Sequence, residues 1–446
     1  MTTEMFRQWT GQLRRKVSQL ALESVWSQEE VDTPKDAPMQ DAQETKEAQE
    51  SRQDARIDAR LLERIGMLVL QDPTSSVTTA AEKQRAVEEI FNAMRRLDVL
   101  EPLMRDPETT EIMVNGPHQV FVERRGRVEP TDVRFDSRER LEELIHHLVA
   151  RVNRNVNESE PIVDARLPDG SRLNAVLAPV ALEGPLLTIR RFPKEPLRMA
   201  GLIASGSLTQ EAADFLGKLV QARYNLFVCG GTGSGKTTFL NVLSSHIPPA
   251  ERIITLEDSA ELRFQGVQNL ARLETRNHNT EGRGEITMQQ LIRTSLRMRP
   301  DRIIVGEVRG AEAFDMLQAM NTGHDGSMST GHANSPADMM RRLETMVSMA
   351  AAIPLSAIQR QIASALDIVV FLQRLRDHSR RVVEIAEVTG CGEEGVVLVP
   401  LFVFEEKADQ TGDGRVQGSL VRTPHALQDT SKLHMRGISL QEQANP

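Results

Sequence analysis

The sequence predicts an α/β fold in which a compact α+β domain precedes a domain with a mostly parallel sheet. Residues 59–192 change from helical periodicity to short alternating β-rich runs, whereas apolar strand-like and helical runs alternate from residue 208 to about residue 405. Such alternation favours a parallel sheet covered by helices. The length of 446 residues is enough for two or three domains.

The first 58 residues are expected to form a helix followed by a linker. Large apolar residues recur at helical spacing between arginines, namely at Phe6, Trp9, Leu13, Val17 and Leu20. This stripe predicts either a surface helix that packs on its own protein or a helix that docks on a partner or a membrane surface. Residues 27–58 are poor in apolar groups, which predicts a disordered or loosely helical linker.

Residues 59–192 contain the signals of a small mixed domain. Helical periodicity runs to about residue 103, and the Asn115-Gly116 pair between β-rich runs predicts a hairpin. An amphipathic helix at 141–152 and short strands between 161 and 189 complete it. A proline-bearing connector, 193–207, follows.

In the second domain the expected strands are 225–229, 252–256, 302–305, 368–372 and 382–388. The last residues, 406–446, lose periodicity and are predicted to be a tail.

Composition limits the classes of function. The net charge of −9 argues against a protein that binds nucleic acid through a broad basic surface. Two cysteines give neither a disulfide framework nor a zinc site. No apolar run reaches the roughly 18–20 residues that span a bilayer, and the N-terminus lacks the apolar core of a signal peptide. These features predict a cytoplasmic protein without a transmembrane segment of its own.

The strongest motif is a phosphate-binding loop, Gly230-Gly231-Thr232-Gly233-Ser234-Gly235-Lys236-Thr237. It follows an apolar strand and precedes a helical run, which is the context that the motif requires. We expect Lys236 to reach the β- and γ-phosphates of ATP and Thr237 to hold Mg²⁺. The residues expected to contact the nucleotide are Gly231, Thr232, Gly233, Ser234, Gly235, Lys236, Thr237 and Thr238.

Acidic residues at the ends of two predicted strands are candidates for the remaining chemistry. Glu307 follows Ile303–Val305 and is expected to polarise the attacking water. Glu257 and Asp258 follow the 252–256 strand, where they are expected to help hold the metal, as is Glu307. The polar run 323–334, with two histidines, is predicted to be a loop near this site.

These motifs resemble those of the secretion ATPase superfamily of type II and type IV systems. The four signatures of that superfamily correspond here to Gly230–Thr237, Glu257–Glu261, Ile303–Glu307 and Gly323–Asn334. Further runs are similar to the Flp/Tad pilus-assembly subgroup, namely Leu273–Arg276, Leu296–Asp301, Gly306–Gly310 and Asp164–Arg172. The resemblance spans about residues 60–405. One departure is Asp377-His378, where the subgroup often has Asp-Gly in a hairpin turn.

The resemblance implies an N-terminal sensor-like α+β domain and a RecA-like P-loop ATPase domain, assembled as a homo-hexamer. It also implies that Arg172 and Arg190 approach the phosphates, with Arg191 and Arg166 as runners-up, and that His332 senses the γ-phosphate. The function that it implies is a motor that powers pilus assembly through an inner-membrane platform protein, with the ATPase at the membrane only through that partner.

Three alternatives stay open at this point. A type IV secretion ATPase is the nearest. A nucleic-acid translocase belongs to the same class of ring, although the acidic charge and the lack of basic–aromatic strips count against it. A scaffolding ring that binds ATP without turnover is disfavoured by Lys236, Thr237 and Glu307.

Overall fold

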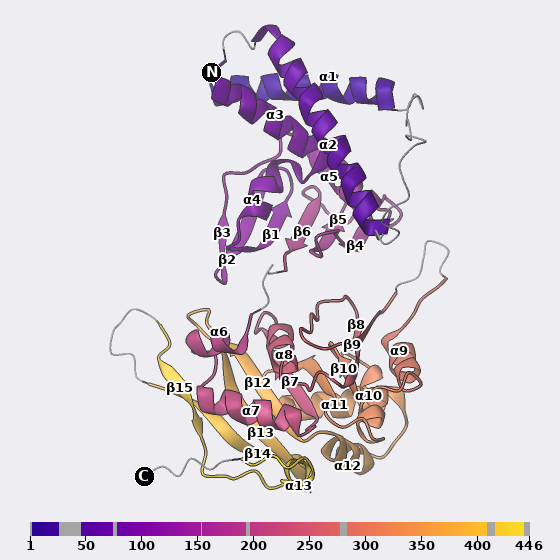
Figure 1. Ribbon diagram of the computed structural model, residues 1–446, viewed down its shortest axis with the longest axis vertical. Helices are drawn as coiled ribbons and strands as arrows, with labels where there is room; N and C mark the ends of the chain where they lie inside the picture. Colours follow the sequence, from indigo (N-terminus) through magenta and orange to yellow (C-terminus); the bar gives the residue numbers. More distant parts are fainter. Residues whose placement is uncertain are drawn as a thin grey trace, which may run out of the picture. The chain divides into compact units, whose positions relative to one another are not determined.

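The chain forms two compact units, Met1–Pro193 and Lys194–Pro446, in the computed structural model (Figure 1). The structure describes residues 2–25, 46–74, 78–152, 154–192, 197–276, 283–407 and 415–440. Trp26, most of the expected linker and residues 193–196 of the expected connector lie outside the described residues.

The first unit opens with three helices that share a small core. They are α1 (Thr3–Val25), α2 (Lys46–Gln71) and α3 (Ala80–Arg95). The apolar stripe of α1, including Phe6 and Trp9, is buried against Ile65 of α2 and Ile90 of α3. The Trp9 Nε1 donates a hydrogen bond to Asp72 Oδ1 at 3.0 Å. The stripe therefore packs on its own protein, which is the first of the two readings of this helix.

Helix α2 begins at Lys46, inside the segment expected to be a linker. Its first turns are rich in Ala, Glu, Gln and Arg, which are strong helix formers. The apolar groups that anchor the helix lie further along, from residue 61 onward, so the low apolar content of 46–58 does not prevent a helix there.

An antiparallel sheet forms the rest of the first unit. Its strands run in the order β3-β2-β1-β6-β5-β4, and the hairpin predicted at Asn115-Gly116 joins β1 to β2. Gly116 has φ +65°, a conformation that glycine adopts without strain. The elements are η2 (Asp98–Leu100), α4 (Glu101–Arg105), β1 (Thr109–Asn115), β2 (Gln119–Arg124), β3 (Arg127–Pro130), α5 (Arg138–Ala150), β4 (Ile162–Arg166), β5 (Arg172–Val176) and β6 (Leu186–Arg190).

The second unit is built on a nine-stranded sheet in the order β15-β14-β13-β12-β7-β11-β10-β8-β9. Strands β12, β7, β11, β10, β8 and β9 are mutually parallel, and β13 to β15 extend the sheet antiparallel. The strands are β7 (Leu226–Gly230), β8 (Arg252–Glu257), β9 (Asn269–Glu274), β10 (Arg302–Val305), β11 (Met328–His332), β12 (Ile368–Arg374), β13 (Arg380–Gly392), β14 (Gly395–Glu406) and β15 (Gly418–Arg422).

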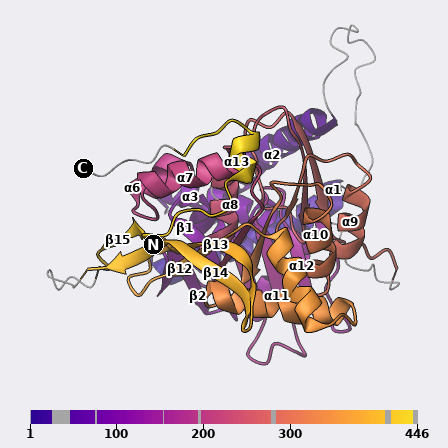
Figure 2. The ribbon, with the colours of Figure 1, turned by 90° about the horizontal axis from the view of Figure 1, so that it is seen from below.

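Helices cover both faces of this sheet, as expected for parallel strands. Apolar side chains of α7, α8 and α13 form one core against the sheet, and those of α9 to α12 form the other. Figure 2 shows α7 and α13 on one side of the strands and α11 and α12 on the opposite side. The helices are α6 (Met199–Ala204), α7 (Gln210–Gln221), α8 (Lys236–Ser244), α9 (Met288–Ser295), α10 (Glu312–Met320), α11 (Pro336–Ala350), α12 (Leu355–Ala365) and α13 (Ser431–Met435).

Two segments differ from the sequence-based expectation. The run expected to be a polar loop contains β11, a buried strand between β7 and β10. The expected tail instead contributes β15 and α13, and its Leu433 lies in the core on the α7 face. In the described parts of the chain, no helix combines the length and the apolar content needed to cross a membrane.

Candidate active site

Four parallel strands bring the candidate residues to one edge of the second sheet. The register of β11 on β7 places His332 opposite Gly230. Strand β10 lies between β11 and β8, so Glu307, two residues beyond β10, and Glu257, the last residue of β8, reach the same edge. Ligands bind at the carboxyl ends of strands in such sheets.

The phosphate-binding loop has a backbone that requires glycine. Gly233 and Gly235 have φ of +70° and +94°. A Cβ atom on Gly230 would lie 2.2 Å from the carbonyl oxygen of Leu372, so this position accepts no side chain. The loop turns directly into α8, whose N-terminus favours anions. The predicted contacts Gly231, Thr232 and Thr238 are exposed, and Thr237 and Gly233 are half-buried, whereas Ser234 is buried.

The Lys236 side chain folds back over this loop. Its Nζ donates to the carbonyl oxygens of Gly230 and Gly231 at 3.1 and 3.0 Å. The same Nζ lies 3.3 Å from His332 Nδ1. The lysine is 7% exposed, so its charge is held within the loop at the place where phosphates are expected.

His332 links Lys236 to Glu307. Its Nε2 lies 2.8 Å from Glu307 Oε1. The pKa of His332 lies below its ordinary value because burial and the Lys236 ammonium disfavour the protonated ring, although the Glu307 carboxylate opposes them. A neutral ring with its proton on Nε2 suits both neighbours, since Nδ1 can accept from Lys236 and Nε2 faces the carboxylate.

Glu307 is held from its other side by Arg309. The Arg309 Nη2 donates to Glu307 Oε2 at 2.8 Å, and this bond raises the pKa of Arg309. Glu307 Oε1 is buried and accepts no aligned hydrogen bond within the described residues, even though the His332 ring is close. The structure thus places Glu307 Oε1 against the His332 ring, and the expected role of Glu307 in orienting the attacking water stays a prediction.

Glu257 supports the loop that follows β8. Its Oε1 accepts hydrogen bonds from the backbone N–H groups of Glu261 and Leu262, both at 2.7 Å. Burial raises its pKa, although these two bonds oppose the shift. Its Oε2 is buried without a hydrogen-bond partner in the described structure. Asp258 is exposed, with Arg309 Nε 3.9 Å from its carboxylate.

These oxygens fit a magnesium ion in one respect. Mg²⁺ in nucleotide sites takes one or two carboxylates together with phosphate and water oxygens, and it needs no protein cage. Glu257 Oε2 and Glu307 Oε1 are buried acceptors that the described residues leave without hydrogen bonds, and the Thr237 hydroxyl is half-buried in the first turn of α8. Among the residues described, no cluster of three or more His, Cys, Asp or Glu side chains could hold a metal ion by itself.

A cleft of about 510 Å³ opens beside the loop. The loop and the end of β11 form one wall, and α11 forms the other. The lining residues are Gly231, Thr232, His332, Ala333, Asn334, Asp338, Arg341, Arg342 and Thr345. The edge therefore combines an anion-binding loop, a lysine, a positioned carboxylate and space for a ligand.

A comparison with known families identifies the family of this chain. Residues 94–410, more than half of the chain, match the family described as type II/IV secretion system protein. The chain belongs to the type II/IV secretion system protein family. Its mixed α/β fold, with an N-terminal α+β unit before a unit built on a mostly parallel sheet, is as predicted.

Individual members of the family are similar over most of their length. A conjugal transfer protein of Mycobacterium tuberculosis is 38% identical over 294 residues, covering 65% of this chain and 83% of the relative. The type IV secretion system protein PtlH of Bordetella pertussis is 35% identical over 317 residues, covering 65% and 93%. The crystal structure of the VirB11 ATPase from the Brucella suis type IV secretion system is 30% identical, covers 65% of this chain and 95% of its own, and has a TM-score of 0.36.

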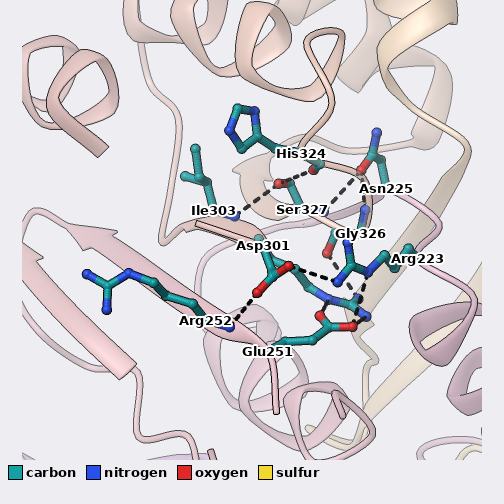
Figure 3. A network of polar contacts seen from close by, with 10 residues as sticks. Arg223, Asn225, Glu251, Arg252, Asp301, Ile303, His324, Gly326 and Ser327 are labelled. Carbon is teal, nitrogen blue, oxygen red and sulfur yellow. Dashed lines mark hydrogen bonds and ion pairs between the residues drawn. The ribbon is translucent and has the colours of Figure 1, made fainter. Parts of the chain in front are cut away.

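Asp301 and His324, from two of the runs named in the sequence, lie just before β10 and β11 in a network of polar contacts (Figure 3). Asp301 Oδ2 accepts a hydrogen bond from the backbone of Arg252, and Arg223 donates to its Oδ1. The carbonyl oxygen of His324 accepts from Ser327 Oγ at 2.7 Å. His324 thus precedes β11 and His332 ends it, so the polar run places one histidine near each end of this strand.

The two N-terminal arginines are neighbours in the first unit. Arg172 and Arg190 lie opposite each other on β5 and β6, and Arg166 lies opposite Arg172 on β4. Glu111 of β1 lies opposite Arg190, so a carboxylate already faces this arginine, and the approach of Arg172 and Arg190 to the phosphates stays a prediction. Arg191 instead donates to the backbone carbonyls of Asp106 and Thr109.

Sequence reasoning gave no role to two groups of arginines near the loop. Arg309 lies two residues after Glu307 in the run Gly306–Gly310, and this short spacing is the one feature of the sequence that could have placed it at the site. Arg374 and Arg380 end β12 and begin β13. Nothing in the local sequence marks these two as neighbours of the phosphate-binding loop.

Proposed function

We propose that this secretion-family chain hydrolyses ATP to ADP and phosphate. The observation that carries the proposal is the chain of contacts from Lys236 through His332 to Glu307 at the mouth of the phosphate-binding loop. Lys236 and the loop bind the phosphates, and Glu307 orients the attacking water. Thr237 would hold Mg²⁺, with Glu257, Asp258 and Glu307 nearby, and the ion would neutralise charge on the phosphates.

The contacts of Lys236 suggest how the γ-phosphate is sensed. A phosphate competes with the carbonyls of Gly230 and Gly231 for the Lys236 ammonium. Any shift of that ammonium changes the field at His332 Nδ1, 3.3 Å away, and His332 in turn faces Glu307. In this proposal a phosphate in the loop changes the contact of His332 with Glu307, and His332 thereby senses the γ-phosphate.

At the level of the machine, we propose a cytoplasmic homo-hexamer that powers assembly of a Flp/Tad pilus through an inner-membrane platform protein. The support is the set of Flp/Tad-like runs in the sequence, such as Leu296–Asp301 and Gly306–Gly310. In the assembled ring, Arg172 and Arg190 contribute positive charge to the nucleotide phosphates.

A type IV secretion motor is the second candidate. It is favoured by the names of the relatives, which include a type IV secretion protein and conjugal transfer proteins. Translocation of nucleic acid is the remaining alternative, and the net charge of −9 counts against it.

Replacement of the native gene by a Lys236→Ala allele separates these cargoes. The pilus proposal predicts loss of surface pilin, with the amount of intracellular pilin unchanged. Loss of conjugation or of a secreted protein, with normal surface pilin, would support the type IV secretion motor instead. Stimulation of the purified ATPase by DNA would support the translocase.

A further inference from the structure

The hairpin between β12 and β13 reaches the phosphate-binding loop from outside the known motifs. Arg374 and Arg380 are cross-strand partners at its end. The Arg380 Nε donates a hydrogen bond to the carbonyl oxygen of Gly233 at 2.8 Å. The Arg374 guanidinium is also near, since a Cβ atom on Gly233 would lie 3.9 Å from its Nη1. Two cations from a distant segment thus flank the middle of the loop.

The turn of this hairpin has an unusual backbone. His378 has φ +66°, which is uncommon for a residue with a side chain. Its Nδ1 lies 3.2 Å from Arg374 Nη2, so the neutral ring can accept a hydrogen bond from that arginine. The imidazole therefore holds Arg374 in place, which a glycine at this position would not do.

The far side of the hairpin is fixed to the rest of the unit. Arg381 Nη2 donates to the carbonyl of Val416 at 2.9 Å. Asp377 Oδ2 accepts from the backbone N–H of Val416 at 2.9 Å. Ser207, just before α7, donates through its hydroxyl to the carbonyl of Arg380 at 2.8 Å. Arg380 is therefore presented by a braced segment.

The contact with Gly233 acts on the peptide that follows it. In a trans peptide the C=O and the next N–H point in opposite directions. Holding the Gly233 carbonyl toward Arg380 turns the Ser234 N–H the other way. That N–H donates a hydrogen bond across the loop to the Gly231 carbonyl at 3.3 Å, the same carbonyl that accepts from Lys236 Nζ. Inward N–H groups are what a phosphate needs from such a loop.

We propose that Arg380 is a positioning residue for nucleotide binding, which fixes the Gly233–Ser234 peptide so that its N–H points into the loop, where a phosphate would compete with the Gly231 carbonyl for it. His378 and Arg374 support it from the same hairpin. The proposal deepens the proposed function and rests on it, because it concerns the nucleotide bound at the same loop.

The test compares Arg380→Ala with Arg376→Ala in the full-length protein. Arg376 belongs to the same hairpin but is exposed and pairs with Glu406, away from the loop. Loss of a charged hydrogen bond predicts that Arg380→Ala weakens the Kd for Mg-ADP, and raises KM for ATP, about tenfold or more. The kcat should change much less, Arg376→Ala should match the wild type, and Arg380→Lys should recover part of the affinity.

Each outcome has a separate meaning. If the wild type binds no nucleotide, the proposed function fails and this proposal fails with it. If the wild type and a folded Arg380→Ala variant bind Mg-ADP equally, or if Arg376→Ala is equally weak, only the positioning role is overturned. Should Arg380→Ala fail to fold, hydrogen exchange of residues 231–235 in Arg380→Lys decides: faster exchange than in the wild type supports the role, and equal exchange overturns it.

Discussion

Replacing Arg302 by Met should destabilise the second unit through one buried carboxylate. Arg302 is fully buried at the start of β10, and its guanidinium donates twice to Glu251, whose side chain is 8% exposed. A third bond goes to the carbonyl of Gly326 at 3.3 Å. Removing one partner of a buried ion pair costs about 3–5 kcal/mol. Arg223 stays 3.1 Å from the same carboxylate, so we expect the lower end of that range, about 3 kcal/mol.

Because the chain has two units, the effect of Arg302→Met on the second unit can be measured apart from the stability of the first. Hydrogen exchange of the β8 and β10 peptides measures the free energy of opening in the second unit. Trp9 is buried in the core of the first unit, and the sequence of the second unit contains no tryptophan, so tryptophan fluorescence should report an unchanged transition. A matched control is Arg376→Ala, which removes an exposed arginine whose partner, Glu406, is also exposed, and its exchange should match that of the wild type.

A double-mutant cycle sharpens the argument. If Arg302→Met is costly because it strands Glu251, then adding Glu251→Gln should recover part of the loss. The reasoning would be refuted by an Arg302→Met protein whose β8 and β10 peptides exchange as slowly as those of the wild type. A loss that Glu251→Gln does not reduce would also refute it.

Three other predictions test separate parts of the structure. The pKa of His332 is lowered in the folded protein, so the unfolded chain binds a proton on this ring more readily. The stability that the neutral ring contributes is therefore complete above pH 6.5 and is lost as the pH falls from there toward the folded pKa. The urea midpoint of His332→Gln should decline less than that of the wild type over this pH range, and a parallel decline would contradict the prediction. Trp9→Ala should lower the free energy of unfolding of the first unit by about 3 kcal/mol because the ring is buried against α2 and α3. Circular dichroism in urea measures this change, and an unchanged transition would show that α1 adds nothing to the stability of the unit. Gly230→Ala forces a Cβ against the Leu372 carbonyl, so it should abolish nucleotide binding and lower the free energy of unfolding by about 3 kcal/mol. The Cβ of Gly231→Ala meets nothing within 4 Å, so this variant should keep the thermal midpoint of the wild type. Equal midpoints for the two variants would contradict the clash at Gly230.

Local signals predicted the parts of the fold that local sequence controls. The apolar run before Gly230 and the glycines after it predicted β7 and its loop, because burial and backbone freedom are properties of those residues themselves. The Asn115-Gly116 turn was predicted for the same reason. The placement of Glu307 and Glu257 at one edge followed from the polarity of parallel strands.

Strand β11 escaped prediction because its burial comes from distant neighbours. Its residues Ser329, Thr330 and Gly331 carry no apolar run, yet all are buried. A side chain at Gly331 would collide with Met339 of α11, whose sulfur lies only 2.9 Å from where a Cβ atom would be. No periodicity encodes such a contact.

The C-terminal segment escaped for a related reason. The Glu387 carboxylate on β13 accepts backbone hydrogen bonds from Gln428 and Asp429, about forty positions away, and so fixes a segment with weak periodicity. The contact of Lys236 with His332 joins positions 96 residues apart. Residue types alone indicated the chemistry of that pair, and only the fold shows that they touch.

The most direct test of the account is ATP turnover by the purified protein with Mg²⁺, beside Glu307→Gln, over a range of protein concentrations. The wild type should hydrolyse more ATP per subunit as a ring assembles. Glu307→Gln should bind ATP with similar affinity but hydrolyse it at about one hundredth of the wild-type rate or below. A wild type that binds ATP without hydrolysing it at any concentration, or a Glu307→Gln variant as fast as the wild type, would contradict the central claim.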